Sequence, residues 1–267
     1  MRREVMIQAK RYWFLGVLLL LASLPAWPQT VEEQIAAGDQ YYAQFDDAKA
    51  LEAYLRALEL DANNYEALWK AARAMIDVAD ALPAKDPATA EKQKKMYQEA
   101  ENYARRAVKA NPDDTWGHFF LSAALGKRAL LLGKKEQIAM SRQVKAEIEK
   151  AIGLDPNNDL AYHALGRWHR RMAEIGGVKR ALGGLLYGDI PRGTFEESEK
   201  NLKKAVELRP NYTNHYLELG RTYLAMGKKD LAAECFQKCL DCPVTTSKCE
   251  LYKQEATEEL AKLKGKK

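Results

Sequence analysis

Apolar and small residues recur along the chain with the spacing of paired amphipathic helices. The clearest example is residues 211–244, where two amphipathic segments flank a turn at Gly227. Small residues at fixed positions allow two antiparallel helices to approach closely, and large residues fill the space between them. This is the pattern of a tetratricopeptide repeat, which places two helices in about 34 residues. With Thr213 as position 1, the large residues are Tyr216, Leu219, Tyr223 and Phe236, and the small ones are Gly220, Ala232 and Cys239.

The same pattern fits four further stretches of the chain. At their boundaries, in ELDANN, KANPDD, GLDPNN and ELRPNY, an Asp or Asn suited to start a helix stands beside residues that end one, usually a proline. Because one hairpin cannot bury its apolar face alone, neighbouring hairpins must stack. We therefore predict an all-α fold, a right-handed tetratricopeptide-like α–α superhelix. Its repeats are expected at about 31–64, 65–114, 115–158, 159–212 and 213–245, followed by a capping helix and basic tail at 246–267.

Several insertions interrupt the repeats, and the largest lies at residues 171–194. It contains six glycines and the apolar segment Ala181–Tyr187. We interpret it either as helix ends with close helix contacts or as a flap over a groove. A Thr194–Glu197 capping box is expected to start the next helix, and a Ser247–Glu250 capping box to start the last one.

The N-terminus has the pattern of a targeting segment. The basic sequence MRREVMIQAKR precedes an apolar run from Tyr12 to Trp27. This pattern predicts a secretory signal peptide at residues 1–26, cleaved after Ala26, or an uncleaved anchor. Both interpretations export the rest of the chain, so a periplasmic or cell-envelope location is expected, with the membrane contacted only through an uncleaved N-terminal segment.

Composition and motifs narrow the function. Alanine, leucine, glutamate and lysine dominate, which favours helices. The net charge of +5 in 267 residues is too small to indicate nucleic-acid binding. No HExxH, GxSxG or phosphate-binding loop is present, and the four histidines lack the spacing of metal ligands. We therefore expect no enzymatic activity, no cofactor and no metal site.

Four cysteines are clustered near the C-terminus: Cys235, Cys239, Cys242 and Cys249. Their spacing resembles that of an iron–sulfur or zinc site, but in an exported chain an even number of cysteines more often indicates disulfides. Cys235 and Cys239 are one helical turn apart, a poor geometry for a bridge. The expected bridge therefore joins Cys249 to Cys239 or Cys242.

Residues 161–221 carry more specific motifs. They include GRW at Gly166–Trp168, an apolar segment at Ala181–Pro191, and a helix start at Thr194 that departs from the usual pattern at Ser198. In these motifs the chain resembles the regulator of microtubule dynamics family, and we expect a bacterial-type, exported relative. The resemblance implies an α–α superhelix without catalytic residues.

The first helix of each tetratricopeptide hairpin lines the concave face of the stack. In the predicted register, this face carries cations together with aromatic rings. Arginine beside aromatic residues suits the carboxylates of an acidic or C-terminal peptide. The alternative is an ordinary solvated helix face with some of the rings in the core. The predicted groove residues are Arg73, Arg167, Arg170, Arg171, Arg221, Lys127, Trp69, Trp116, Phe119 and His163.

These observations predict a non-enzymatic scaffold of the cell envelope that holds a protein or peptide in its concave groove. One alternative is a small-molecule-binding accessory component of an exported transport system, which a closed pocket lined by Ala181–Tyr187 would favour. The other is a structural assembly factor for an envelope complex.

Overall fold

The computed structural model describes residues 30–83 and 86–265, and in these ranges every regular element is an α-helix. The all-α prediction is therefore confirmed. The predicted signal segment at 1–26 lies outside the described residues. The helices are α2 (Val31–Ala43), α3 (Asp47–Leu60), α4 (Tyr65–Ala81), α5 (Pro87–Ala110), α6 (Thr115–Ala129), α7 (Lys134–Leu154), α8 (Asp159–Ala173), α9 (Gly177–Tyr187), α10 (Phe195–Leu208), α11 (Thr213–Ala225), α12 (Lys229–Asp241) and α13 (Cys249–Lys264).

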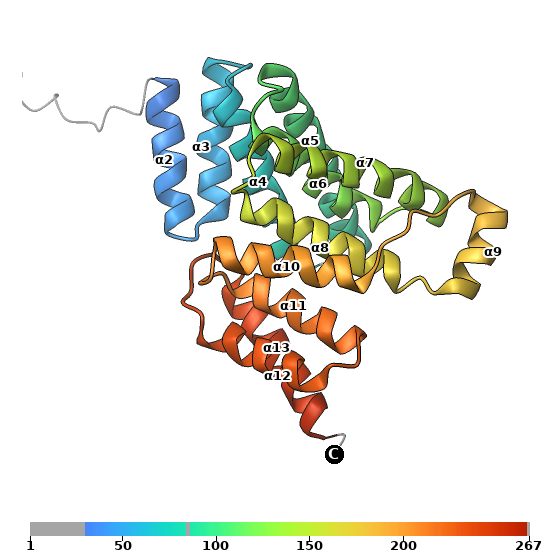
Figure 1. The fold of residues 1–267 in the computed structure, drawn as a ribbon. Helices are drawn as coiled ribbons and strands as arrows, with labels where there is room; N and C mark the ends of the chain where they lie inside the picture. Colours follow the sequence, from blue (N-terminus) through green and yellow to red (C-terminus); the bar gives the residue numbers. More distant parts are fainter. Residues whose placement is uncertain (1–29, 84–85, 266–267) are drawn as a thin grey trace, which may run out of the picture.

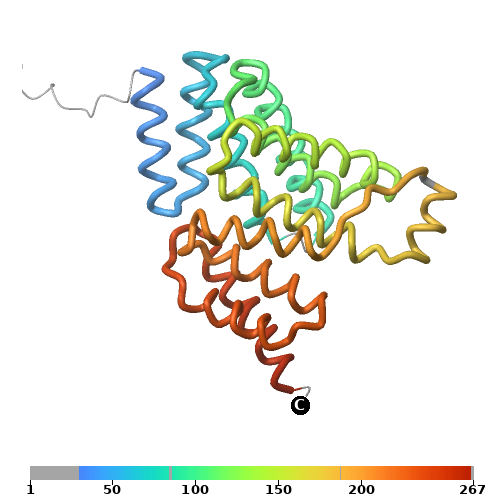
Figure 2. The backbone as a smooth tube through the Cα atoms, viewed as in Figure 1, coloured from blue at the N-terminus to red at the C-terminus, as the bar shows by residue number. Residues whose placement is uncertain are grey.

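The helices pack as successive hairpins that form a superhelix. The pairs are α2 with α3, α4 with α5, α6 with α7, α8 with α10, and α11 with α12, while α13 packs on the last pair. Figure 1 shows the hairpins following one another, with α9 projecting from the stack. In Figure 2 the tube turns, so that the last helices lie below the first ones in this view.

Helix starts are fixed by short polar side chains at the boundaries between hairpins. The side-chain oxygen of Asn64 accepts a hydrogen bond from the Ala67 amide at 3.0 Å, and that of Asn158 accepts one from Ala161 at the same distance. Asp114 caps α6 in the same way. A cap of this kind stabilises a helix by about 1 kcal/mol because it satisfies an amide that the helix itself leaves unpaired.

Helix pairs close where a glycine faces a large side chain. A Cβ atom added to Gly38 would lie 2.4 Å from the Tyr54 ring, and one added to Gly220 would lie 2.5 Å from the Phe236 ring. Both rings are fully buried. The glycines are therefore required by the close approach of the two helices and not by backbone conformation.

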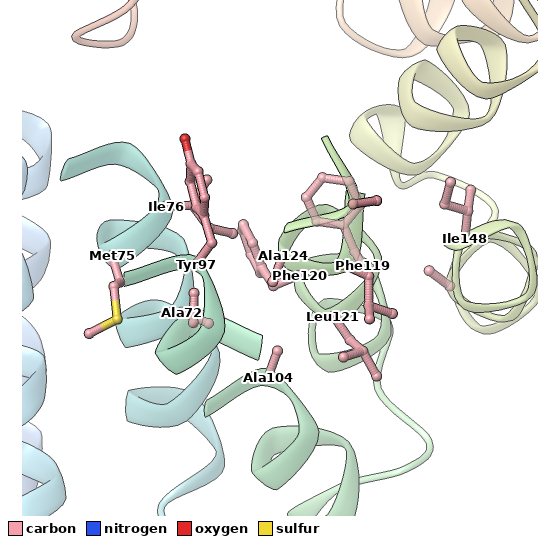
Figure 3. Close-up of a cluster of buried hydrophobic side chains, with 14 of the residues drawn as sticks. Ala72, Met75, Ile76, Tyr97, Ala104, Phe119, Phe120, Leu121, Ala124 and Ile148 are labelled. Atoms are coloured by element: carbon pink, nitrogen blue, oxygen red, sulfur yellow. The ribbon is translucent and has the colours of Figure 1, made fainter. Parts of the chain in front are cut away.

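The largest apolar cluster lies between α4, α5, α6 and α7 (Figure 3). Alanines such as Ala72 and Ala104 bring the helices close, and Met75, Phe120 and Ile148 fill the remaining space. This cluster fixes the inner surface of α4 and α6, on which the candidate site is built.

Two segments differ from the sequence expectations. The apolar insertion forms α9, and two of its large apolar side chains point to solvent: Leu185 is 85% exposed and Leu186 is 72% exposed. The last helix begins at Cys249 and has no side-chain cap. The expected Ser247–Glu250 capping box is absent because the Ser247 hydroxyl donates instead to Asp47 of α3, at 2.6 Å. Thr194 does cap α10, accepting from the Glu197 amide at 3.1 Å.

We predict opposite effects of alanine at two helical glycines. Gly220→Ala should destabilise the fold by about 1–3 kcal/mol, because the buried Phe236 ring has no room to move. Gly153→Ala, on the exposed side of α7 with open space around it, should stabilise by about 0.5–1 kcal/mol. Urea unfolding measures both, and shifts of the same sign would contradict the packing argument.

Candidate binding groove

The first helices of the hairpins form the inner layer of the superhelix. The backbones of helices α2, α4, α6, α8 and α11 approach one another across hairpin boundaries, whereas in the described residues the backbones of the second helices do not. All the predicted groove residues lie on this inner layer. The structure thus brings them to one side of the stack, although most of them already have partners within the chain.

The predicted aromatic residues pack mainly against one another. Trp69 of α4 stacks on Trp116 of α6 with ring centroids 5.4 Å apart, and on Phe120 at 5.5 Å. Phe119 is buried and meets Phe120 edge to face at 4.9 Å. These rings extend the core to the inner surface. This agrees with the alternative that some of the predicted groove rings belong to the core.

Two of the predicted cations are held by neighbouring side chains. The Arg73 guanidinium lies 3.6 Å from the centroid of the Tyr42 ring and donates to the Tyr54 hydroxyl at 3.1 Å. The Lys127 ammonium lies 2.6 Å from both carboxylate oxygens of Asp80. Neither cation is free to act as an isolated charge in the groove.

Three predicted arginines converge on one buried carboxylate, Glu218 of α11, which is 2% exposed. Arg170 approaches it at 2.5 Å, Arg221 at 3.0 Å and Arg167 at 3.5 Å. Burial raises the pKa of Glu218, but the three guanidiniums outweigh burial and hold the pKa well below its ordinary value. This cluster joins α8 to α11 and thereby the fourth hairpin to the fifth.

His163 does not present a charge to the groove. Its Nδ1 lies 3.0 Å from Nδ1 of His215, and Nε2 of His215 lies 2.9 Å from an Asp159 carboxylate oxygen. Both rings are buried, and burial lowers the pKa of each. The pair is therefore neutral at pH 7, and one Nδ1 donates a hydrogen bond to the other.

A cavity of about 870 Å³ remains between α6, α7, α8 and the start of α9. Val144, Leu160 and Ile175 form an apolar part of its wall. At its edge, Arg171 has no ion pair or hydrogen bond among the described residues, while Arg167 keeps only a long contact to Glu218. Burial and the neighbouring charge of Arg167 lower the pKa of Arg171. An anion bound here would relieve that repulsion.

Acidic side chains that were not among the predicted groove residues lie beside its cations. Asp77 and Asp80 follow Arg73 on the same helix, and Glu218 precedes Arg221 by three residues. A carboxylate three or four residues from a cation on a helix lies on the same face, so this spacing was the available signal. That the predicted groove residues bind a partner stays a prediction.

The four cysteines are buried free thiols. The expected bridge from Cys249 to Cys239 or Cys242 is not formed. The Cys249 sulfur instead accepts hydrogen bonds from the Thr213 and Thr246 hydroxyls and from the Thr245 amide, each at 3.4 Å. Burial raises the pKa of Cys249, but these hydrogen bonds outweigh it and lower the pKa to about 7. The sulfur thus organises the turn before α13.

No cluster of metal-binding side chains occurs in the part of the chain that the structure describes.

We predict that Glu218→Gln destabilises the fold by about 3–5 kcal/mol, because it removes the buried charge that three guanidiniums share; Arg170 and Arg221 keep Glu174 and Glu255, but Arg167 keeps no other ion pair among the described residues. The matched variant Glu207→Gln removes an exposed carboxylate paired with Lys204, and should cost less than about 1 kcal/mol. Urea unfolding at pH 7 measures both, and equal losses would contradict the argument.

The same cluster predicts a pH dependence. The pKa of Glu218 is lower in the folded state than its ordinary value of 4.5, so the unfolded state binds more protons below that pH. The stability that Glu218 contributes is complete above about pH 4.5 and is lost as the pH falls further. The difference between wild type and Glu218→Gln should therefore shrink between pH 5 and pH 3; a constant difference would contradict it.

The chain is similar to proteins of known family. Residues 34–264 match the family model described as regulator of microtubule dynamics protein 1-3. Regulator of microtubule dynamics protein 1 of Mus musculus is 31% identical over 235 residues, which cover 87% of this chain and 75% of that protein. The protein of the same name in Caenorhabditis elegans is 22% identical over 215 residues, covering 80% of this chain and 92% of its own length.

A solved structure supports the fold. The crystal structure of a thermophilic tetratricopeptide-repeat protein of Thermus thermophilus superposes with a TM-score of 0.62, at 18% identity, over 87% of this chain and all of that one. At this identity the similarity shows the fold alone, and it confirms the predicted tetratricopeptide-like superhelix.

The expected location is wrong. Relatives in mouse, cattle and humans are named regulators of microtubule dynamics, and animal cells have no periplasm. In residues 30–83 and 86–265 no helix is long and apolar enough to cross a membrane. The inference of disulfides rested on export to an oxidising compartment, so it loses its support together with the location.

The similarity extends over nearly all of the helical stack, from α2 to α13. The matched range also includes the GRW motif at Gly166–Trp168, the apolar segment Ala181–Pro191 and the helix start at Thr194. The chain belongs to the regulator of microtubule dynamics family.

Proposed function

We propose that the protein is a non-enzymatic binding scaffold whose inner groove, between α6 and α9, holds a segment of a partner protein. The observation that carries this proposal is Arg171, an arginine without an ion pair in the described residues, at the edge of an apolar cavity. Arg167 stands beside it and has donors that Glu218 does not use. The fold supports the proposal because tetratricopeptide-like stacks present extended concave surfaces.

The chemistry of the groove defines the partner segment. Two adjacent guanidiniums favour a carboxylate, to which each of them can donate two hydrogen bonds. The apolar wall around Val144 and Leu160 favours an aliphatic or aromatic residue next to that carboxylate. The partner segment therefore presents an acidic residue, or a C-terminal carboxylate, beside an apolar side chain.

The relatives' name indicates where to look for this partner. They are regulators of microtubule dynamics, so we take microtubules and the proteins bound to them as the first partners to test.

A small molecule is the second candidate. Lys179, Gly183 and Ile190, from α9 and the residues that follow it, contribute to the wall of the cavity. The cavity of about 870 Å³ is in the size range of ligand pockets. An amphipathic molecule with one anionic group would satisfy the same two arginines and the same apolar wall.

We predict that Arg171→Glu weakens binding of acidic peptides by at least about tenfold, because it places a like charge at the carboxylate site. The probes are fluorescein-labelled peptides that contain Glu-Leu pairs, compared with peptides in which Gln replaces Glu, and fluorescence anisotropy measures affinity. Lys150→Glu makes the same charge change at an exposed position of α7 outside the cavity and should leave binding unchanged.

Equal binding of the Glu and Gln peptides would overturn the proposed acidic partner. Co-sedimentation of the same variants with microtubules tests whether the microtubule itself is bound. The amphipathic anion 8-anilinonaphthalene-1-sulfonate tests the small-molecule candidate. Enhanced fluorescence of this probe that Arg171→Glu abolishes, together with no peptide binding, would favour the second candidate.

A further inference from the structure

The segment between α12 and α13, residues 243–248, reaches back to the first two hairpins; we call it the strap. The Lys248 ammonium lies 2.6 Å from Asp77 and 2.6 Å from Asp80, both on α4. The Ser247 hydroxyl donates to Asp47 of α3 at 2.6 Å. Among the described residues, α11, α12 and α13 do not pack against α2 to α5. Polar side chains of the strap therefore connect the two ends of the superhelix.

The acidic site on α4 is held in place by residues other than the strap. Asp80 accepts hydrogen bonds from the Tyr97 hydroxyl and from Lys127, at 2.6 Å each. Asp77 accepts one from the Tyr42 hydroxyl at 3.4 Å. Helix α4 itself is fixed in the main core, where Met75 and Ile76 are buried. The carboxylates are thus positioned for a cation whether or not the strap supplies it.

The site needs one more cation than its own hairpins supply. Three carboxylates, Asp47, Asp77 and Asp80, face Lys127 and the more distant Arg73, which lies on the Tyr42 ring. Lys248 supplies the third positive charge. Burial lowers the pKa of Lys248, but Asp77 and Asp80 outweigh burial and raise it, so the ammonium stays protonated.

The strap contacts α3 and α4 through the ends of two polar side chains, Ser247 and Lys248, and Thr245 and Val244 are exposed. Another lysine that entered the site would restore the same ion pairs, so exchange would conserve the number of compensated charges.

We propose that Asp47, Asp77 and Asp80 form a lysine-binding site that Lys248 occupies within the chain, and that a partner protein displaces the strap with a segment presenting a lysine after a serine or threonine. This site is distinct from the groove between α6 and α9, and it selects the opposite charge. It rests on the function proposed above only in that the partner is a protein.

Because Lys248 occupies the lysine-binding site within the chain, a partner segment must compete with the strap. A tethered segment acts at an effective concentration of about millimolar, so a free peptide with equal contacts must reach similar concentrations. Removing the Lys248 side chain should therefore reveal binding that the wild-type chain masks.

The probe is a fluorescein-labelled peptide, Pro-Val-Thr-Thr-Ser-Lys-Ser. It copies the strap and the residue that follows it, with serine in place of Cys249. In the full chain, Lys248→Ala should bind this peptide at least about tenfold more tightly than wild type does. The double variant Lys248→Ala, Asp77→Asn should lose that binding, because Asp77 has no other ion pair in the described residues. A peptide with norleucine in place of lysine should not bind.

Controls separate this site from structural damage and from the groove. Lys253→Ala, on α13 and without an ion pair to α4 among the described residues, should bind the peptide as wild type does. Hydrogen exchange in residues 243–249 should be faster in Lys248→Ala, with the helices unchanged. Equal peptide binding by wild type and Lys248→Ala, or equal binding of the norleucine peptide, would overturn the proposal. Adding Arg171→Glu to Lys248→Ala should leave strap-peptide binding intact, so a failure of the groove proposal is distinguishable.

Discussion

The structure depends on close contact between helices at positions where one side chain is absent or is only a methyl group. Gly38 against Tyr54 and Gly220 against Phe236 show the constraint in the first and last hairpins. The first helix of each hairpin approaches the first helix of the next one and so lines the inside of the superhelix. The inner surface, with its rings and charges, follows from this arrangement.

The charged side chains on the inner surface form groups in which acidic and basic residues are paired. Glu218 gathers three arginines from α8 and α11, and Asp80 gathers two lysines that are far apart in the sequence. Such groups join hairpins through electrostatics where apolar contact is limited. Arg171 at the cavity edge differs from them, because its guanidinium has no ion pair among the described residues.

The fold could be predicted because its determinants are local and periodic. Asn64, Asp114 and Asn158 mark helix starts in the sequence and cap helices in the structure. Pairs far apart in the sequence could not be predicted, because Asp159 with His215 and Asp77 with Lys248 meet only through the superhelical turn. Ser247 illustrates the limit: its local sequence predicts a capping box, but a carboxylate two hundred residues away binds its hydroxyl. The location failed for another reason, since an apolar N-terminal run indicates a targeting segment without identifying the cell that reads it.

The strap also bears on how the stack unfolds. In an open stack of repeats each hairpin interacts only with its neighbours, so stability is a sum of short-range terms and the end hairpins fray independently. Ser247 and Lys248 add a coupling between the last segment and the first two hairpins. Fraying at either end then requires breaking a contact with the other end. The superhelix behaves as a closed loop of interactions in which the terminal hairpins share a common unfolding transition.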